Sequence, residues 1–412
     1  MSQSIEPTSK EDLIALLCDS YSCAREDYIV KFKSKHWDVF PEGYGDKLSD
    51  PSVWPNFRNN GLTAGFDIGW TAPGIMTCNA NQVSEPGKIR RAIERYESLK
   101  SIVGADFISE YHEANVGNPE YVEHRGLRLN TTDMRHLHDA WRLQQFYSNK
   151  SKTNSGRPII IDIGGGFGGL AAKIKQIYPD ALVVLLDLPE VNAVQTYYLK
   201  TRFPNSRLLT YRAFKETSAE SLIESDYDFA VLPGWTLDFF PDNSIDLAVN
   251  TRSMMEMNKS VVDHYISEIG RTLRSSGVFY CVNRYIKTTV GEKICIKEYA
   301  FDDHWYLAVS GVAWDQHWLH ELVAVRTELP VSHPGATLLE ALPPYRWSDV
   351  FANLKRTFVM LWHLTWGGHH NTNPGVRGRV RHARINSIRW LLATLKRNDP
   401  VYRAAKKLTG RG

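Results

Sequence analysis

An acid and a cluster of glycines form the first stretch of the sequence that could do chemistry. In IIIDIGGGFGGLA, residues 159–171, an apolar run leads through Asp162 into a glycine-rich segment. The glycines are Gly164, Gly165, Gly166, Gly168 and Gly169. Glycines let a backbone approach a ligand closely, although a tight turn also uses them for positive φ without binding anything. The segment predicts a cofactor-binding turn and leaves the cofactor open.

Two acidic residues bear on the choice of cofactor. The glycine spacing fits both the GxGxxG dinucleotide fingerprint and the GxGxG pattern of proteins that bind S-adenosylmethionine (SAM). Asp162 would repel a pyrophosphate at the helix N-terminus, whereas it would attract the sulfonium and ammonium groups of SAM. Asp187 ends the next apolar run, where it can accept the ribose hydroxyls of either cofactor. The acids favour SAM, and a dinucleotide-dependent oxidoreductase acting on a nucleotide sugar remains the alternative.

Strands and helices alternate from residue 157 onward. The predicted strands are 158–163, 181–188, 244–251 and 277–285, with 305–312 and 319–327 as a closing pair. The predicted helices between them are 168–178, 191–203 and 260–274. Continuous apolar strands separated by helices predict an α/β fold with a doubly wound, mostly parallel sheet.

The wider sequence resembles class I SAM-dependent O-methyltransferases. The run from 159 to 191, which includes DLPEV, resembles their first motif and the acid after it, and SIDLAVNTRSMMEM at 244–257 resembles their fourth strand. Asn250, Ser253 and Glu256 within that run are most similar to a bacterial family of sugar O-methyltransferases. The segments VNR at 282–284 and GNPEYVEHRGLRLNTTDMRH at 117–136 are similar to the same family.

This resemblance implies a Rossmann-like enzyme that methylates a sugar hydroxyl of a surface glycan, such as O-antigen, or of its precursor. The cofactor-binding residues it implies are Asp162, Gly164, Gly165, Gly166, Gly168, Asp187, Leu188, Asn250 and Ser253. The acceptor-binding residues it implies are Asp133, Arg135, His136 and Arg284. A protein of this fold that has lost turnover and acts as an assembly partner is a further alternative.

The general base is the least certain assignment from sequence. Relatives that methylate hydroxyls often place a histidine just after the fourth strand, and NTRSMMEMNKS at 250–260 has none. Glu256 is the titratable group best placed to accept the hydroxyl proton, with orienting the cofactor or capping a helix as its alternative role. His264, within a predicted helix, and His304 are further candidates, and a structural role is the alternative for His264.

Residues 301–306, FDDHWY, contain side chains that could bind a divalent metal. Asp302, Asp303 and His304 are suitable ligand types, but contiguous residues do not all point the same way in a strand. A solvated turn is the better interpretation, and we predict no metal site.

The chain divides into three predicted parts. A polar segment at 148–158 separates the alternating pattern from an N-terminal region with helical periodicity at 9–34, at 85–103 and from Thr131 or Thr132 onward. We predict a helical and loop region at 1–152 that shapes the acceptor pocket and a SAM-dependent methyltransferase domain at 153–335. A basic helical extension at 336–412 completes the chain.

Cysteine usage and hydropathy predict a cytoplasmic protein. The five cysteines are scattered and form no CxxC pair, which is typical of reduced thiols. The N-terminus has no apolar signal segment, and no run of about 18 apolar residues could span a bilayer.

The C-terminal residues 351–412 are strongly basic. They hold 13 lysines and arginines and one aspartate, whereas the other 350 residues hold 36 basic and 45 acidic side chains. Segments 351–366 and 385–397 mix basic, aromatic and aliphatic residues, which suits an interfacial helix on anionic lipid at the inner membrane face. Core packing or contact with another copy is the alternative, nucleic-acid binding is less favoured, and the oligomeric state stays open.

We expect the full-length protein to float with vesicles of anionic lipid and a 1–350 truncation to stay behind, because the truncation removes most of the excess positive charge. Liposome flotation measures this difference. Equal flotation of the two chains would contradict the membrane assignment.

Overall fold

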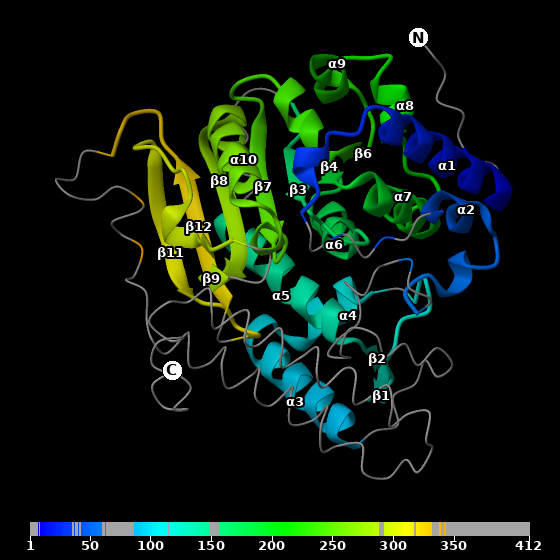
Figure 1. Ribbon diagram of the computed structural model, residues 1–412. Coiled ribbons are helices and arrows are strands. Elements are labelled where there is room, and N and C mark those ends of the chain that lie inside the picture. The colour runs from blue at the N-terminus through cyan, green and yellow to red at the C-terminus, as the bar shows by residue number, and fades with distance from the viewer. Residues whose placement is uncertain are drawn as a thin grey trace, which may run out of the picture.

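The fold is an α/β sandwich built on one large sheet, which confirms the predicted Rossmann-like class (Figure 1). The structure is a computed structural model. It describes residues 9–34, 43–59, 86–113, 115–147, 156–287, 292–316 and 319–331, and single residues at 7, 37, 40, 62, 338 and 342. The basic segment 351–412 lies outside these residues, as does most of the predicted extension.

Eight strands form the sheet in the order β11-β12-β8-β7-β3-β4-β6-β5. Six are parallel: β3 (Ile159–Ile163), β4 (Leu182–Asp187), β5 (Leu208–Thr210), β6 (Phe229–Pro233), β7 (Ile245–Thr251) and β8 (Leu273–Arg284). The hairpin of β11 (Trp305–Val312) and β12 (Leu319–Arg326) adds to β8 with β12 antiparallel to it, as the sequence predicts.

The strand order reverses at β3. From β3 the chain moves to β4 on one side and later returns to β7 on the other. In a doubly wound sheet, ligands bind beyond the carboxyl ends of the strands at such a point. The glycine turn follows β3 directly, so the topology places it at the expected position.

Alternating side chains of the strands enter two separate cores. Ile160 of β3 packs in the core that faces α1 (Lys10–Glu26), α5 (Thr131–Phe146), α6 (Gly169–Ile177) and α7 (Pro189–Arg202). Ile159 and Ile161 pack in the core on the other face, with α10 (Lys259–Thr272). Because both faces are covered, the parallel strands are continuously apolar.

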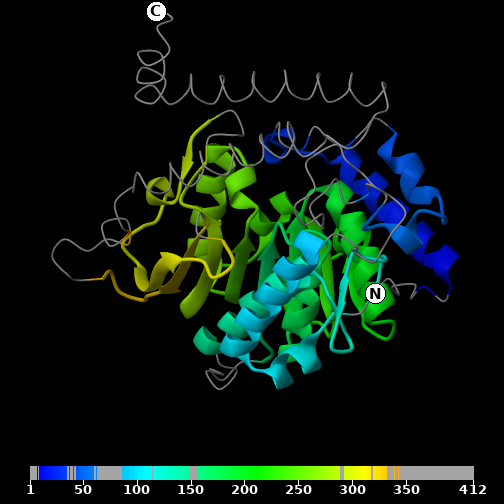
Figure 2. The same ribbon diagram turned by 90° about the horizontal axis from the view of Figure 1, so that it is seen from below.

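The remaining elements surround these layers. They are α2 (Tyr44–Ser49), α3 (Pro86–Val103), α4 (Ala105–Tyr111), α8 (Tyr211–Phe214), α9 (Ala219–Glu224), β1 (Val122–His124), β2 (Leu127–Leu129), β9 (Ile286–Lys287) and β10 (Ile294–Cys295). Helix α3 packs on α5 and, with α4 and the β1–β2 hairpin, encloses a third, smaller core (Figure 2). Among the described residues, no helix combines the length and apolar content needed to cross a bilayer.

Two helix boundaries differ from the sequence prediction. Helix α1 begins after Ser9, whose hydroxyl accepts the Asp12 N–H at 3.0 Å in a capping box, but it ends at Glu26 rather than continuing to residue 34. Asn130 caps α5 in place of Thr131 or Thr132. Its carboxamide oxygen accepts two backbone N–H groups, because asparagine is at least as strong an N-cap as threonine.

The N-terminal region shares the core of the sheet across the boundary predicted at residue 152. Leu13 and Leu17 of α1 belong to the same buried cluster as Ile160 and Val183 of the sheet. Helix α1 packs on α7 and α5 packs on α6. The helices α1 and α5, which precede the sheet in the sequence, therefore help to cover one of its faces.

A buried ion pair connects α5 to α6. Asp133 Oδ1 lies 2.5 Å from Lys173 Nζ, and both side chains are about 2% exposed or less. The other oxygen, Asp133 Oδ2, lies 2.8 Å from His112 Nδ1. Burial would raise the pKa of Asp133, but the Lys173 ammonium and the hydrogen bond to His112 outweigh it and hold this pKa well below its usual range. The neighbours of the Asp133 carboxylate are thus the protein side chains Lys173 and His112, and the acceptor contact expected for Asp133 stays a prediction.

Replacing Asp133 with leucine leaves Lys173 buried without its partner. We expect the free energy of unfolding to fall by about 3–5 kcal/mol, as when one member of a buried pair is removed. The double variant Asp133→Leu/Lys173→Met should recover most of this loss, because no unpaired charge remains. Urea denaturation measures both, and equal losses in the single and double variants would contradict the assignment.

Candidate functional site

The glycine turn is closed tightly against the end of β7. Gly164, Gly166 and Gly168 have φ of +68°, +58° and +97°, a region that favours glycine. A Cβ on Gly164 would lie 2.1 Å from Ser253 Oγ, and one on Gly165 would lie 2.5 Å from Asp162 Oδ2. Because these glycines have no side chain, the end of β3 can pack closely against Ser253, and Gly165 can lie against the Asp162 carboxylate.

Asp162 lies beneath this turn as a buried acid without a partner. Its side chain is fully buried, and neither carboxylate oxygen has a hydrogen-bond partner among the described residues. Burial, with a smaller contribution from Asp139, raises its pKa to about 7. An orphaned buried carboxylate fits a cationic ligand, because a cation or donor there would offset the cost of its desolvation.

Asp187 lies at the end of β4, next to Asp162 across the sheet. Its Oδ1 accepts the Leu188 N–H at 2.8 Å, and its Oδ2 accepts Gln195 Nε2 at 3.1 Å. Burial, with Asp162 as a further contributor, raises its pKa to about 8. Gln195 Nε2 also donates to the Gly166 carbonyl at 2.8 Å. The Gln195 side chain therefore fixes the position of the Asp187 carboxylate relative to the glycine turn.

Leu188 contributes its backbone to this arrangement. It is the N-cap residue of α7, and its side chain is 8% exposed within the core. The N–H of Leu188 orients the acid expected to bind the ribose.

The Asn250 side chain connects neighbouring strands by hydrogen bonds and does not face a ligand. Its Nδ2 donates to the Ile163 carbonyl at 2.8 Å and to Ser253 Oγ at 2.6 Å. Its Oδ1 accepts the Met254 N–H at 3.3 Å and Asn283 Nδ2 at 2.8 Å. The predicted cofactor contact by Asn250 is wrong, because the side chain is fully buried and all of its hydrogen-bonding capacity is used.

Glu256 ends a short 3-10 helix, Met254–Glu256, that follows β7. Its side chain is 20% exposed, and Oε1 lies 3.4 Å from Lys287 Nζ. The Glu256 carbonyl accepts the Ser34 hydroxyl at 2.5 Å, which fixes the helix against the N-terminal region. Arg284, at the end of β8, interacts electrostatically with Glu256, and its Nε has no partner among the described residues. Glu256 and Arg284 therefore lie at the same edge of the sheet, and their roles as base and acceptor ligand stay predictions.

His264 does not join this group. Its Nε2 lies 2.7 Å from Asp238 Oδ1, and its ring packs edge-on against Phe32 at 5.8 Å. These contacts give His264 a structural role at the N-terminal half of α10, and the catalytic assignment is not supported.

His304 was predicted as a catalytic residue, and the structure places it at the wrong end of the sheet. The antiparallel register pairs Leu319 with Arg284 at the carboxyl end of β8 and Trp305 with Arg326 at the other end of the hairpin. His304 precedes Trp305, so it lies near the amino ends of the parallel strands.

The alternative metal site at 302–304 is not assembled either. Asp302 forms an ion pair with Arg326 and accepts the His304 N–H at 2.9 Å. Within the described part of the chain, no group of three potential metal ligands gathers.

One acceptor residue predicted on α5, His136, lies beside the turn. His136 packs against Gly169 and the Phe167 ring, and a Cβ on Gly169 would lie 2.6 Å from His136 Nδ1. Burial, with Lys173 and Arg135 nearby, lowers the pKa of His136 to about 3, so its ring is neutral. Arg135 donates to Thr132 Oγ1 at 2.8 Å and lies near Arg252, which follows β7.

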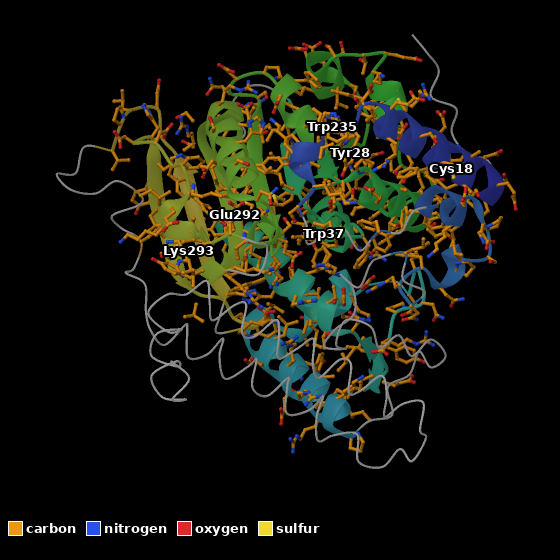
Figure 3. All side chains as sticks on the ribbon, viewed as in Figure 1. Cys18, Tyr28, Trp37, Trp235, Glu292 and Lys293 are labelled. Carbon is orange, nitrogen blue, oxygen red and sulfur yellow. The ribbon has the colours of Figure 1, made fainter. Side chains whose placement is uncertain are left out.

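An aromatic group at the end of β6 was missed by sequence reasoning. Trp235 follows β6, and Tyr28 and Phe32 from the N-terminal region pack against it with ring centroids 5.9 and 6.2 Å away (Figure 3). The sequence prediction contained no strand at 229–233, so nothing marked Trp235 as a residue at a strand end. Trp235 is 3% exposed and belongs to the core that contains α10, so this aromatic group joins the N-terminal region to the end of β6.

A family comparison bears on the class of the protein. A sequence model of the O-methyltransferase domain matches residues 97–211, a range that includes the glycine turn, Asp162 and Asp187. The protein is a SAM-dependent methyltransferase. Its cofactor is S-adenosylmethionine, and the buried Asp162 and the acid of Asp187 fit the cationic and ribose parts of that molecule.

Several solved methyltransferases are similar to this chain. Mitomycin 7-O-methyltransferase is 13% identical over 76% of this chain and 95% of its own, with a TM-score of 0.32. Geranyl diphosphate C-methyltransferase from Streptomyces coelicolor A3(2) is 12% identical over 46% of this chain and 76% of its own, with a TM-score of 0.32. TM-scores of this size do not define a common fold, so the class rests on the strand order and the domain match. No curated protein matches the sequence at a significant level.

The raised pKa values of Asp162 and Asp187 predict that SAM binding weakens in acid. Asp162 must be ionised to attract the cations of SAM, and an ionised Asp187 is the better acceptor for the ribose hydroxyls. Asp187 takes up a proton as the pH falls through about 8, and Asp162 does so through about 7. We expect SAM affinity to fall about 10- to 100-fold from pH 7.5 to 5.5, because each unit below a pKa costs up to about ten-fold. Calorimetry measures this, and the Asp162→Asn variant should show a flatter dependence. Constant affinity over this range would contradict the role of the acids.

Proposed function

We propose that the protein transfers a methyl group from SAM to a sugar hydroxyl, in a bacterial surface glycan or its precursor. The observation that supports transfer to a hydroxyl is the position of Glu256, a partly exposed carboxylate on the helix that begins where Ser253 contacts the glycine turn. The sugar rests on sequence similarity around 117–136 and 250–257.

Bound SAM supplies a methyl group that is already activated on its sulfonium. The residues of this chain then have to position an acceptor, exclude water and remove one proton. The Glu256 carboxylate would accept the hydroxyl proton of the acceptor while the oxygen attacks in line. Lys287 and Arg284 lie close to Glu256 and would orient its carboxylate toward the acceptor.

The segment that carries Glu256 is rigidly supported. The N–H of Met255 donates to Asn283 Oδ1 at 3.1 Å, and the Glu256 carbonyl accepts the Ser34 hydroxyl. Fixing the backbone at both positions limits how far the carboxylate can drift, and small displacements of a general base are costly. This support favours a chemical role for Glu256 over helix capping.

Replacing Glu256 with glutamine should lower methyl transfer by about 10²- to 10⁴-fold, the usual contribution of a general base. Binding of SAM and S-adenosylhomocysteine should stay within about two-fold, because the base faces the acceptor. Transfer of a labelled methyl group into a glycan fraction and calorimetry measure the two effects.

The matched control is Glu224→Gln, the same change at an exposed position on α9. It should leave both transfer and binding unchanged. Turnover retained by the Glu256 variant would remove its role as base, and wild-type protein that binds SAM but labels no glycan would remove the sugar assignment.

A further inference from the structure

Three arginines from separate elements meet beside the end of β7. Arg252 follows β7, Arg135 lies on α5 and Arg95 lies on α3. Electrostatic interactions link the three with each other and with Asp315, and Arg135 and Arg252 with Asp139. We call these five residues the arginine cluster.

Arg252 forms ion pairs with both carboxylates of the arginine cluster. Its Nη1 lies 2.7 Å from Asp139 Oδ2 and its Nη2 lies 3.2 Å from Asp315 Oδ1. Both aspartate side chains are 2% exposed, and Tyr280 donates its hydroxyl to Asp139 Oδ1 at 3.1 Å. Arg252 itself has φ of +68°, a conformation that a non-glycine residue adopts only when its surroundings hold it there.

Arg135 is left without a carboxylate in this arrangement. Its contact among the described residues is the neutral hydroxyl of Thr132 at 2.8 Å. Arg95 donates at 3.4 Å to a backbone carbonyl, that of Asp315. The cluster therefore holds three guanidinium groups against two carboxylates. Burial lowers the pKa of Arg135 to about 10, with Arg252 as the next contributor, so the group stays charged and poorly solvated at neutral pH.

The cluster lies next to the methyl-transfer site. Arg252 directly precedes Ser253, which contacts Gly164, and Asp139 raises the pKa of Asp162. The charged groups that influence Arg135 are Arg252, Asp315, Arg95 and Asp139. They come from α3, α5, the end of β7 and residue 315, so Arg135 lies where these elements meet.

We propose that Arg135, assisted by Arg95, binds an anionic group on the acceptor, so that the enzyme methylates an acidic sugar. This inference rests on the proposed function and names the substrate class more narrowly. The anionic group is a carboxylate, as in a uronic acid, or a phosphoryl group. A planar guanidinium binds either of these through paired hydrogen bonds, and it selects against neutral sugars because they would leave the half-buried guanidinium without an anionic partner.

The test uses full-length protein saturated with S-adenosylhomocysteine and measures sugar binding by calorimetry. The probes are glucuronate, glucose 1-phosphate and glucose, three sugars that differ mainly in the anionic group. We expect the better of the two anionic probes to bind at least about ten-fold more tightly than glucose, as one charge-assisted contact allows. Arg135→Gln should reduce that affinity to the level of glucose, and Arg135→Lys should retain part of the preference.

Binding of S-adenosylhomocysteine is the control for correct folding and for the alternative that Arg135 binds the cofactor. Affinity for S-adenosylhomocysteine should be unchanged in Arg135→Gln, and Arg90→Gln, an exposed arginine on α3, should behave as wild type throughout. A loss of S-adenosylhomocysteine affinity in Arg135→Gln without loss in Arg135→Lys would overturn the proposal, because Arg135 would then hold the carboxylate of the cofactor.

Two further outcomes separate this inference from the proposed function. Equal binding of glucose and both anionic sugars would overturn the anionic preference and leave sugar methylation standing. Binding of none of the three sugars, with binding of S-adenosylhomocysteine intact, would overturn both the sugar assignment and the preference built on it.

Discussion

The contact between Gly164 and Ser253 is the constraint on which the site depends. It joins the end of β3 to the end of β7, the two strands between which the strand order reverses. Asn250 secures the contact by bonding to β3, to Ser253 and to Asn283 of β8. A side chain at Gly164 would force these strand ends apart, so the glycine shapes the site by allowing contact between protein segments as much as by approaching a ligand.

Charged residues in this protein fall into two groups by the partners they have. Buried charges with complete pairs, such as Asp133 with Lys173, hold the N-terminal helices on the sheet. Charges with incomplete pairing are the buried Asp162 at the end of β3 and the half-buried Arg135 beside Arg252, which follows β7. Because burial of an unpaired charge is costly, the second group marks where ligands of opposite charge are expected, with cationic SAM on one side and an anionic acceptor on the other.

Sequence reasoning found the elements whose signal is local and strong. The strands β3, β4 and β7 and the two strands of the closing pair are apolar runs whose predicted bounds agree with the structure to within one residue, whereas β8 begins four residues earlier than predicted. The strand β6 was missed, because five residues between the short helix α9 and a 3-10 helix give little periodicity. The residues assigned to the cofactor turn lie together, whereas Asn250 and Asp133 were assigned to ligands and bind other parts of the protein.

The sequence by itself determined the class of cofactor turn and the alternation of strands and helices. Both depend on local patterns of residue types, because backbone conformation and burial restrict which residues occur at neighbouring positions. Only the tertiary structure decided which polar residues are free for chemistry. Glu256 and His304 looked alike as candidates, yet the strand register places one at the carboxyl edge and the other at the opposite edge. Partners such as Arg252 for Asp139 lie 113 residues apart, and spacing along the chain does not record which charges meet in space.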